Sequence, residues 1–127
     1  MGLDVEVTGN ALPHAEIERL VTLAVATAAV DYGHVAVAFV GPDAIAELNV
    51  AHRGHEGPTD VLSFPVDGID DVAGPPGLRE LGDIVICPEH TVDLREAVVH
   101  GALHLVGMDH ETDDGEMLAV QAEILSW

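Results

Sequence analysis

The spacing of hydrophobic and polar residues predicts four strands and four helices. Residues 3–9 (LDVEVTG) alternate and are rich in β-branched side chains, which is typical of a strand. Residues 34–41, 59–66 and 82–88 predict three more strands, and the first of these is apolar enough that we expect it to be buried on both faces. Helical spacing marks residues 12–30, residues 41–53, the segment from Thr91 onward and the short amphipathic stretch 115–127.

Two polar segments interrupt this pattern. Residues 66–82 are rich in Gly, Pro and Asp, and they predict an exposed loop rather than a linker between domains. Residues 109–115 are expected to separate the last two helices. The element order βαβαββαα predicts an α+β fold, a small mixed β-sheet packed with helices. A length of 127 residues favours a single domain, residues 1–127.

Composition places this domain in a general class. Hydrophobic residues make up 48% of the chain and charged residues 21%, which argues against global disorder. The longest apolar run is far short of the ~20 residues needed to cross a bilayer, so no membrane partner is expected. The one cysteine, Cys87, and the lack of a basic N-terminal leader fit a reducing compartment. We therefore expect a cytoplasmic protein.

The charge is strongly one-sided. There are 23 acidic residues, four arginines and no lysine, which gives a formal net charge of -19. This charge by itself argues against a polyanionic partner, because proteins that bind nucleic acids usually carry a basic surface. It suits either a protein that works at high salt, where screening removes self-repulsion, or an ordinary acidic soluble protein.

The candidate chemistry lies in the stretch HGALHLVGMDH, residues 100–110. His100 and His104 are one helical turn apart and share a face. Gly107 can adopt a positive φ, end the helix and let His110 approach the same point. Three neutral imidazoles leave one tetrahedral position open, as in catalytic zinc sites. The chain has eight histidines, so a chance pair is possible, but three histidines around a helix-ending glycine favour a metal site.

Gly101 stands where metalloproteases with similar histidine spacing carry a glutamate. That glutamate is the general base, and without it peptide hydrolysis would lose a factor of ~10²–10⁴, so a protease is disfavoured. Glycine costs about 1 kcal/mol relative to alanine inside a helix. Its presence indicates either that a bulky substrate such as a phosphodiester needs room above the metal, or that the helix packs closely on a strand.

Several motifs together resemble one family. HGALHLVGMDH is similar to the H-G-x-L-H-L-x-G-x-D-H signature of the bacterial YbeY endoribonucleases. The stretch RGHEGPTDVLSFP, residues 53–65, resembles a second block of that family, and LGDIVICPE, residues 81–89, resembles a third. The ELN of residues 47–49 also sits where the family has it.

The resemblance implies a zincin-like α+β fold with a metal-binding helix. It further implies a single-strand-specific metallo-endoribonuclease that acts in rRNA processing, notably 16S 3′-end maturation, and in 70S ribosome quality control. Its partners would be single-stranded RNA or rRNA and the ribosome or small-subunit proteins. One Zn²⁺ per chain would be bound by His100, His104 and His110, and Arg53 would be the functional arginine near the metal.

Some alternatives remain open. The chain could be a zinc-dependent hydrolase of another substrate, or a ribosome-associated binding module with a structural zinc. Arg53 could stabilise charge on a phosphate, since a guanidinium matches phosphate oxygens, or could form a structural salt bridge. Asp60 and Asp109 could act as bases, as partners of imidazole N–H groups, or as turn and cap residues.

The sequence also departs from the family in two ways. The segment between the strand of residues 82–88 and His100 is shorter than is usual in the family, which usually has an extra stretch of helix there; either the lineage has trimmed that helix or the sequence omits a segment. Family members often carry a basic groove for RNA, whereas this chain has four arginines and no lysine.

Overall fold

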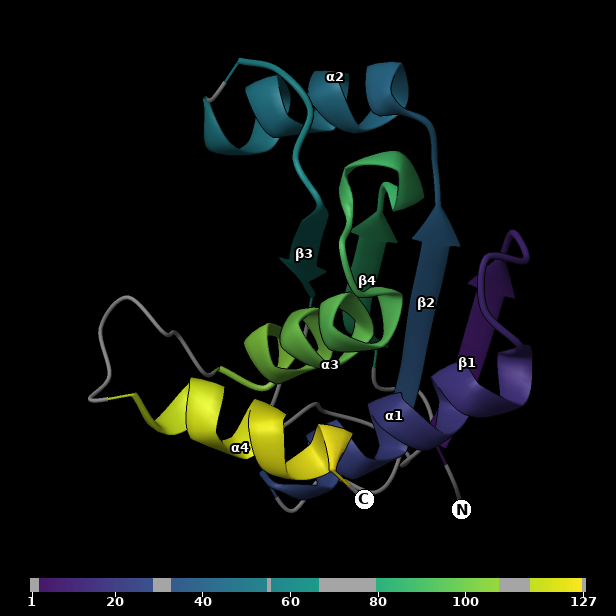
Figure 1. Cartoon of the computed structure of the whole chain (residues 1–127), viewed down its shortest axis with the longest axis vertical. Coiled ribbons are helices and arrows are strands. Elements are labelled where there is room, and N and C mark those ends of the chain that lie inside the picture. Colours follow the sequence, from purple (N-terminus) through teal and green to yellow (C-terminus); the bar gives the residue numbers. More distant parts are fainter. Residues whose placement is uncertain (1–2, 29–32, 55, 67–79, 108–114, 127) are drawn as a thin grey trace.

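The fold is an α+β arrangement, as the element order predicted. The computed structural model describes residues 3–28, 33–54, 56–66, 80–107 and 115–126. Its elements run β1 (Leu3–Thr8), α1 (His14–Ala26), β2 (Gly33–Phe39), α2 (Pro42–Arg53), β3 (Val61–Pro65), β4 (Glu80–Ile86), the 3₁₀ turn η1 (Pro88–His90), α3 (Leu94–Leu105) and α4 (Glu116–Leu125) (Figure 1).

The four strands form one mixed sheet in the order β1-β2-β4-β3. β1 and β4 both pair in parallel with β2, and β3 pairs antiparallel with β4. The parallel pair β1 and β2 is joined through α1, since a parallel connection needs a crossover long enough to hold a helix. The predicted mixed sheet is therefore confirmed.

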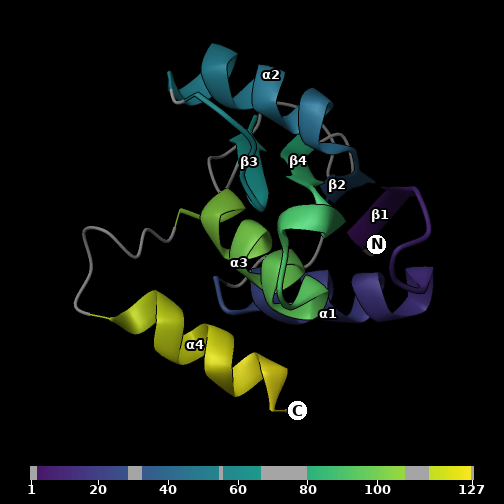
Figure 2. The ribbon, with the colours of Figure 1, turned by 45° about the horizontal axis from the view of Figure 1, so that its top comes forward.

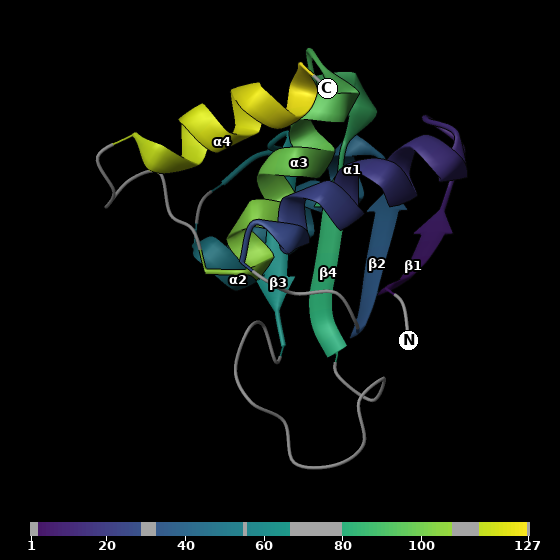
Figure 3. The same cartoon turned by 90° about the horizontal axis from the view of Figure 1, so that it is seen from below.

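Helices α1, α3 and α4 gather on one face of the sheet, and α2 lies apart from them near the ends of β3 and β4 (Figures 1, 2 and 3). The main core lies between that face and the helices, and a second, smaller cluster lies under α2. The smaller cluster consists of Ile45, Leu62, Val85 and Cys87. Among the described residues, no helix is long and apolar enough to cross a membrane.

The expectation that β2 is buried on both faces was wrong. Val35 and Val37 face the main core and are buried, whereas the alternating residues Ala36 and Ala38 are only half-buried. These alanines line a shallow depression of about 320 Å³ on the other face of the sheet. The reason is that α2 covers only part of that face.

Some predicted boundaries also shift. β4 begins at Glu80, inside the predicted loop of residues 66–82, and residues 67–79 of that loop lie outside the described part. α3 begins at Leu94 rather than Thr91, because the carboxylate of Asp93 caps it by accepting hydrogen bonds from the backbone N–H groups of Arg95 and Glu96. The predicted break at residues 109–115 lies outside the described residues, apart from Gly115.

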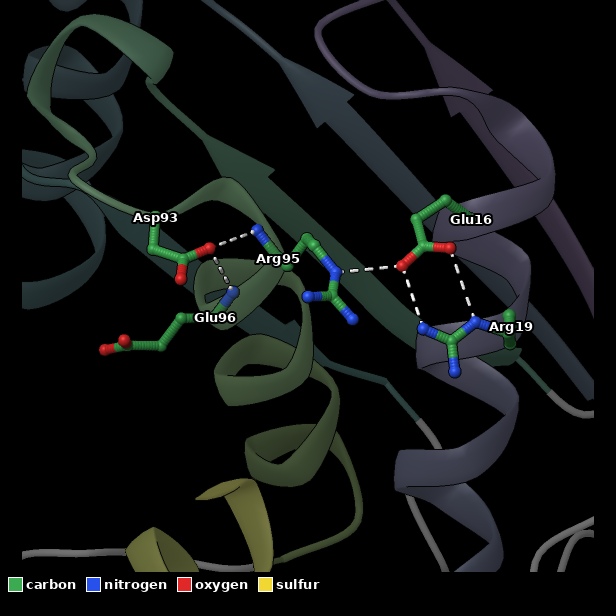
Figure 4. A network of polar contacts seen from close by, with 5 residues as sticks. All are labelled: Glu16, Arg19, Asp93, Arg95 and Glu96. Atoms are coloured by element: carbon green, nitrogen blue, oxygen red, sulfur yellow. Dashed lines mark hydrogen bonds and ion pairs between the residues drawn. The ribbon is translucent and has the colours of Figure 1, made fainter. Parts of the chain in front are cut away.

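An ion network ties the start of α3 to α1 (Figure 4). The carboxylate of Glu16 accepts hydrogen bonds from Arg19 Nη2 and from Arg95 Nε, each at 2.9 Å. These hydrogen bonds lower the pKa of Glu16 below its ordinary value. Arg95 therefore links α3 to α1, whereas Arg19 pairs with Glu16 within α1.

Candidate functional site

His100 and His104 do share one face of α3, as their spacing predicted. Both imidazoles are half-buried, and their Nε2 atoms lie 3.2 Å apart. Two nitrogens bound to one tetrahedral zinc at ~2.0–2.1 Å would be about 3.3 Å apart. The two side chains are therefore spaced as two ligands of a single ion would be.

A third residue orients His100. Its Nδ1 lies 2.9 Å from Oε1 of Gln121, which projects from α4 and is only 7% exposed. An amide oxygen can only accept, so Nδ1 of His100 carries the proton and donates it. The proton on Nδ1 leaves the lone pair on Nε2, the atom that faces His104. This arrangement fits metal binding, because ligating histidines usually donate their other N–H to a fixed acceptor.

The predicted third ligand, His110, lies outside the described residues. Within the part of the chain that the structure describes, no group of three or more His, Cys, Asp or Glu side chains gathers as a complete metal site. The helix-ending role of Gly107 is confirmed. Its φ is +91°, and its N–H donates to the carbonyl of His104 directly after α3 ends.

Gly101 is explained by packing and not by room for a substrate. A Cβ placed on Gly101 would lie 2.6 Å from Cγ2 of Ile84 on β4 and 3.2 Å from Oγ of Ser63 on β3. Oγ of Ser63 also donates to the carbonyl oxygen of Gly101 at 3.0 Å. Position 101 therefore faces the sheet. A glutamate there would enter the core instead of reaching the histidines, so the missing general base follows from the close helix-to-strand contact.

The two histidines open onto a cleft of about 950 Å³. Its walls come from the end of α2, from β3, from the segment that links η1 to α3, from α3 itself and from α4. Besides His100 and His104, the ionisable residues that line it are His52, Asp60, His90, Asp93 and Glu96. The cleft is large enough for a drug-sized or short oligomeric ligand.

The described lining of the cleft carries more negative than positive charge. Among its described lining residues there is no arginine, and Arg19 and Arg95 are bound to Glu16. Arg53 is the last residue of α2 and directly follows His52, which lines the cleft. Its side chain lies outside the described residues, so its predicted role stays a prediction.

Asp60 behaves as a turn residue. Its Oδ1 accepts from the backbone N–H of Val61 at 2.8 Å, and its backbone carbonyl accepts from the N–H of Cys87. It lines the cleft but is already committed to the start of β3. Asp109, the other candidate, lies outside the described residues.

Sequence reasoning missed Gln121, Ser63 and His52. Gln121 is distant from His100 in the sequence, and only its near-regular helical spacing from Met117 and Ile124 places it on the buried side of α4. Ser63 stands in the middle of an otherwise apolar strand, which is a signal for a polar partner. His52 has no metal-ligand spacing to the other histidines, so the sequence gives no signal of its place beside the cleft.

Comparisons with known proteins agree with these observations. The sequence model of the family described as endoribonuclease YbeY matches residues 5–127. A protein named endoribonuclease YbeY from Salinispora tropica is 39% identical, with 89% of this chain and 90% of the relative aligned. A solved structure of a Thermotoga maritima protein superposes with a TM-score of 0.55 at 29% identity, covering 96% of this chain and 87% of that one.

The relatives are longer than this chain. The relative from Rubrobacter xylanophilus is 47% identical over 73% of this chain, but the match covers only 66% of the relative. The protein of Leifsonia xyli aligns over 145 positions with 34% identity, although this chain has 127 residues. That alignment therefore includes positions occupied only in the relative. The place of the missing residues, expected before His100, stays a prediction.

Proposed function

Because the chain belongs to the YbeY endoribonuclease family, we propose that it is a metal-dependent endoribonuclease that cleaves single-stranded RNA in the cleft beside α3. The observation that carries this proposal is the pair of imidazoles on α3, whose Nε2 atoms lie 3.2 Å apart at the cleft. We further propose that the RNA is rRNA, with 16S 3′-end maturation and 70S ribosome quality control as the setting. Ribosomal or small-subunit partners in the cytoplasm follow from that setting.

The proposed cofactor is one Zn²⁺ per chain, bound by His100, His104 and His110. When bound, zinc polarises a phosphoryl oxygen or lowers the pKa of a bound water toward ~7. The protein contributes orientation: Gln121 holds the His100 ring so that Nε2 faces His104. The ion network of Glu16, Arg19 and Arg95 keeps the start of α3 fixed against α1.

Arg53 is the proposed source of positive charge. It follows His52 at the end of α2, so its backbone is adjacent to a residue of the cleft wall. A guanidinium that contacts the phosphate would stabilise the negative charge that develops there in the transition state. This would lower the barrier to RNA cleavage without a general-base carboxylate at position 101. The geometry of the sheet contact, which excludes a carboxylate at that position, is consistent with such an electrostatic mechanism.

The experiment is a cleavage assay with purified protein on a single-stranded RNA, with the same sequence as a duplex and with casein. We expect cleavage of the single strand only, its loss with a chelator, and its recovery when zinc is added. Circular dichroism of the chelated protein should show a folded chain, because a catalytic zinc does not hold the fold together. Unfolding on chelation would favour a structural zinc. Cleavage that survives complete removal of metal would contradict the proposal.

A further inference from the structure

Among the described residues that line it, the cleft has no permanent positive charge with which to attract RNA. Three carboxylates line it, those of Asp60, Asp93 and Glu96, and its described lining contains no arginine. Attraction of phosphates usually dominates binding of nucleic acids. A chain with a net charge of -19 must obtain more of its affinity from contacts with the bases.

Stacking on flat rings is the base contact that does not depend on charge. Single-stranded RNA exposes the faces of its bases, and proteins bind them with aromatic side chains or histidine. Aromatic residues are only 3% of this chain, and the described lining of the cleft contains no Phe, Tyr or Trp. Histidine rings are therefore the flat surfaces that the described cleft offers.

His52 differs from the other cleft histidines because a phenylalanine supports its ring. The imidazole lies against Phe64 of β3, with ring centroids 4.3 Å apart and planes inclined by 48°. Phe64 itself does not line the cleft; it packs against the smaller core cluster. The contact thus comes from outside the cleft and restricts the His52 ring while leaving it accessible.

The backbone under His52 is also fixed. Gly54 adopts a positive φ of +72° and ends α2, and its backbone N–H donates a hydrogen bond to the carbonyl of Val50 at 3.0 Å. The side chain of Asn49, 5% exposed, donates to the carbonyl of Gly57 at 2.9 Å and ties the following loop to the helix. A ring on such a turn needs little further ordering when it meets a ligand.

We infer that His52, supported by Phe64, is a stacking platform for a nucleobase of single-stranded RNA bound in the cleft. The inference deepens the proposed function and rests on it. A duplex keeps its base faces covered, so the platform would select for single strands. Because every base has a flat face, the platform would be tolerant of sequence.

The experiment uses fluorescence anisotropy to measure binding of a 2′-O-methyl oligouridylate. It is repeated with a series of oligomers that each lack the base at one different position of the strand. His52→Ala should weaken binding of the intact oligomer by about tenfold or more, whereas His52→Phe should bind close to wild type because it keeps a flat ring. Removing the base that stacks on His52 should weaken RNA binding by the wild type but should hardly change the affinity of His52→Ala.

The control is His14→Ala, the same substitution on α1 outside the cleft. It should bind RNA as wild type does, and all variants should keep their metal content. Wild-type protein that binds and cleaves RNA, together with an unchanged His52→Ala, would overturn the stacking platform and leave the proposed function intact. Wild-type protein that neither binds nor cleaves RNA would overturn both.

Discussion

Helix α3 has two faces built from different chemistry. Its sheet face carries Gly101, which is buried. A Cβ added at Gly101 would lie only 2.6 Å from Cγ2 of Ile84. Its cleft face has His100 and His104, half-buried and spaced as ligands of one ion would be. The short signature HGALH thus combines a packing residue with candidate metal ligands, so one stretch of sequence should respond to mutation in two separate ways.

The largest expected effect is on the rate of RNA cleavage, and it comes from Arg53, which lies on α2 and not on α3. Arg53→Ala should lower the turnover number for single-stranded RNA by a factor of ~10²–10³, which is typical for loss of one preorganised donor. Arg53→Lys should recover only part of the rate, because an ammonium lacks the planar fork. Steady-state cleavage and metal analysis check this. A folded, metal-loaded Arg53→Ala with full activity would remove Arg53 from the mechanism.

The second effect isolates the cleft face. Gln121→Leu removes the acceptor for Nδ1 of His100 and should weaken zinc affinity by about 10- to 100-fold. Gln121→Glu keeps an acceptor oxygen at the same place and should bind zinc close to normally. Competition with a chromophoric chelator measures both. Equal affinities of the Leu variant and wild type would show that Gln121 does not orient a ligand.

The third effect isolates the sheet face. Gly101→Ala should destabilise the fold by ~1–3 kcal/mol, because its Cβ would overlap Ile84 in a packed core. Gly41→Ala is the control, since a Cβ there meets nothing within 4 Å. Urea denaturation of both variants gives the comparison. Normal stability of Gly101→Ala combined with lost RNA cleavage would instead indicate that position 101 faces the substrate.

The smallest effect concerns a histidine away from α3. His34 on β2 contacts Glu80 of β4 through Nδ1 at 2.6 Å, and Asp4 and Glu6 of β1 add negative charge. Burial of the ring lowers its pKa, but the hydrogen bond to Glu80 and the carboxylate charges outweigh this, so the pKa of His34 lies above the ordinary value near 6.5.

The sign of the pH dependence follows from that shift. A raised pKa in the folded state adds stability that is complete below pH ~6.5 and is lost as pH rises through the folded value. Wild type should therefore lose about 0.5 kcal/mol more than His34→Gln between pH 6 and 9, a modest figure because the side chains are partly exposed. Urea denaturation across this range measures it. Identical pH profiles for the two proteins would contradict the assignment.

Much of the fold followed from local sequence patterns. The strands and helices lie close to the predicted positions. An element with one buried face repeats its apolar residues with the period of a helix or of a strand, and this period can be read from the sequence. The helical pairing of His100 and His104 and the positive φ of Gly107 are local as well. Such features depend on neighbours within a turn or two.

The features that the sequence mispredicted, left open or did not reveal depend on contacts between distant segments. The half-open face of β2 depends on how much of the sheet α2 covers, and Gly101 depends on the approach of Ile84 on β4. Gln121 meets His100 only because α4 packs beside α3. A single sequence does not encode these distances in any local pattern, so the reason for Gly101 stayed open until the packing was known.

The central claim is that the cleft face of α3 binds a metal ion, and metal analysis of native protein beside His104→Ala tests it most directly. Both proteins would be purified without added metal and their zinc measured by mass spectrometry, with circular dichroism as the check of folding. The account predicts close to one zinc per native chain and nearly none in a folded His104→Ala. Equal zinc content in the two folded proteins would contradict it.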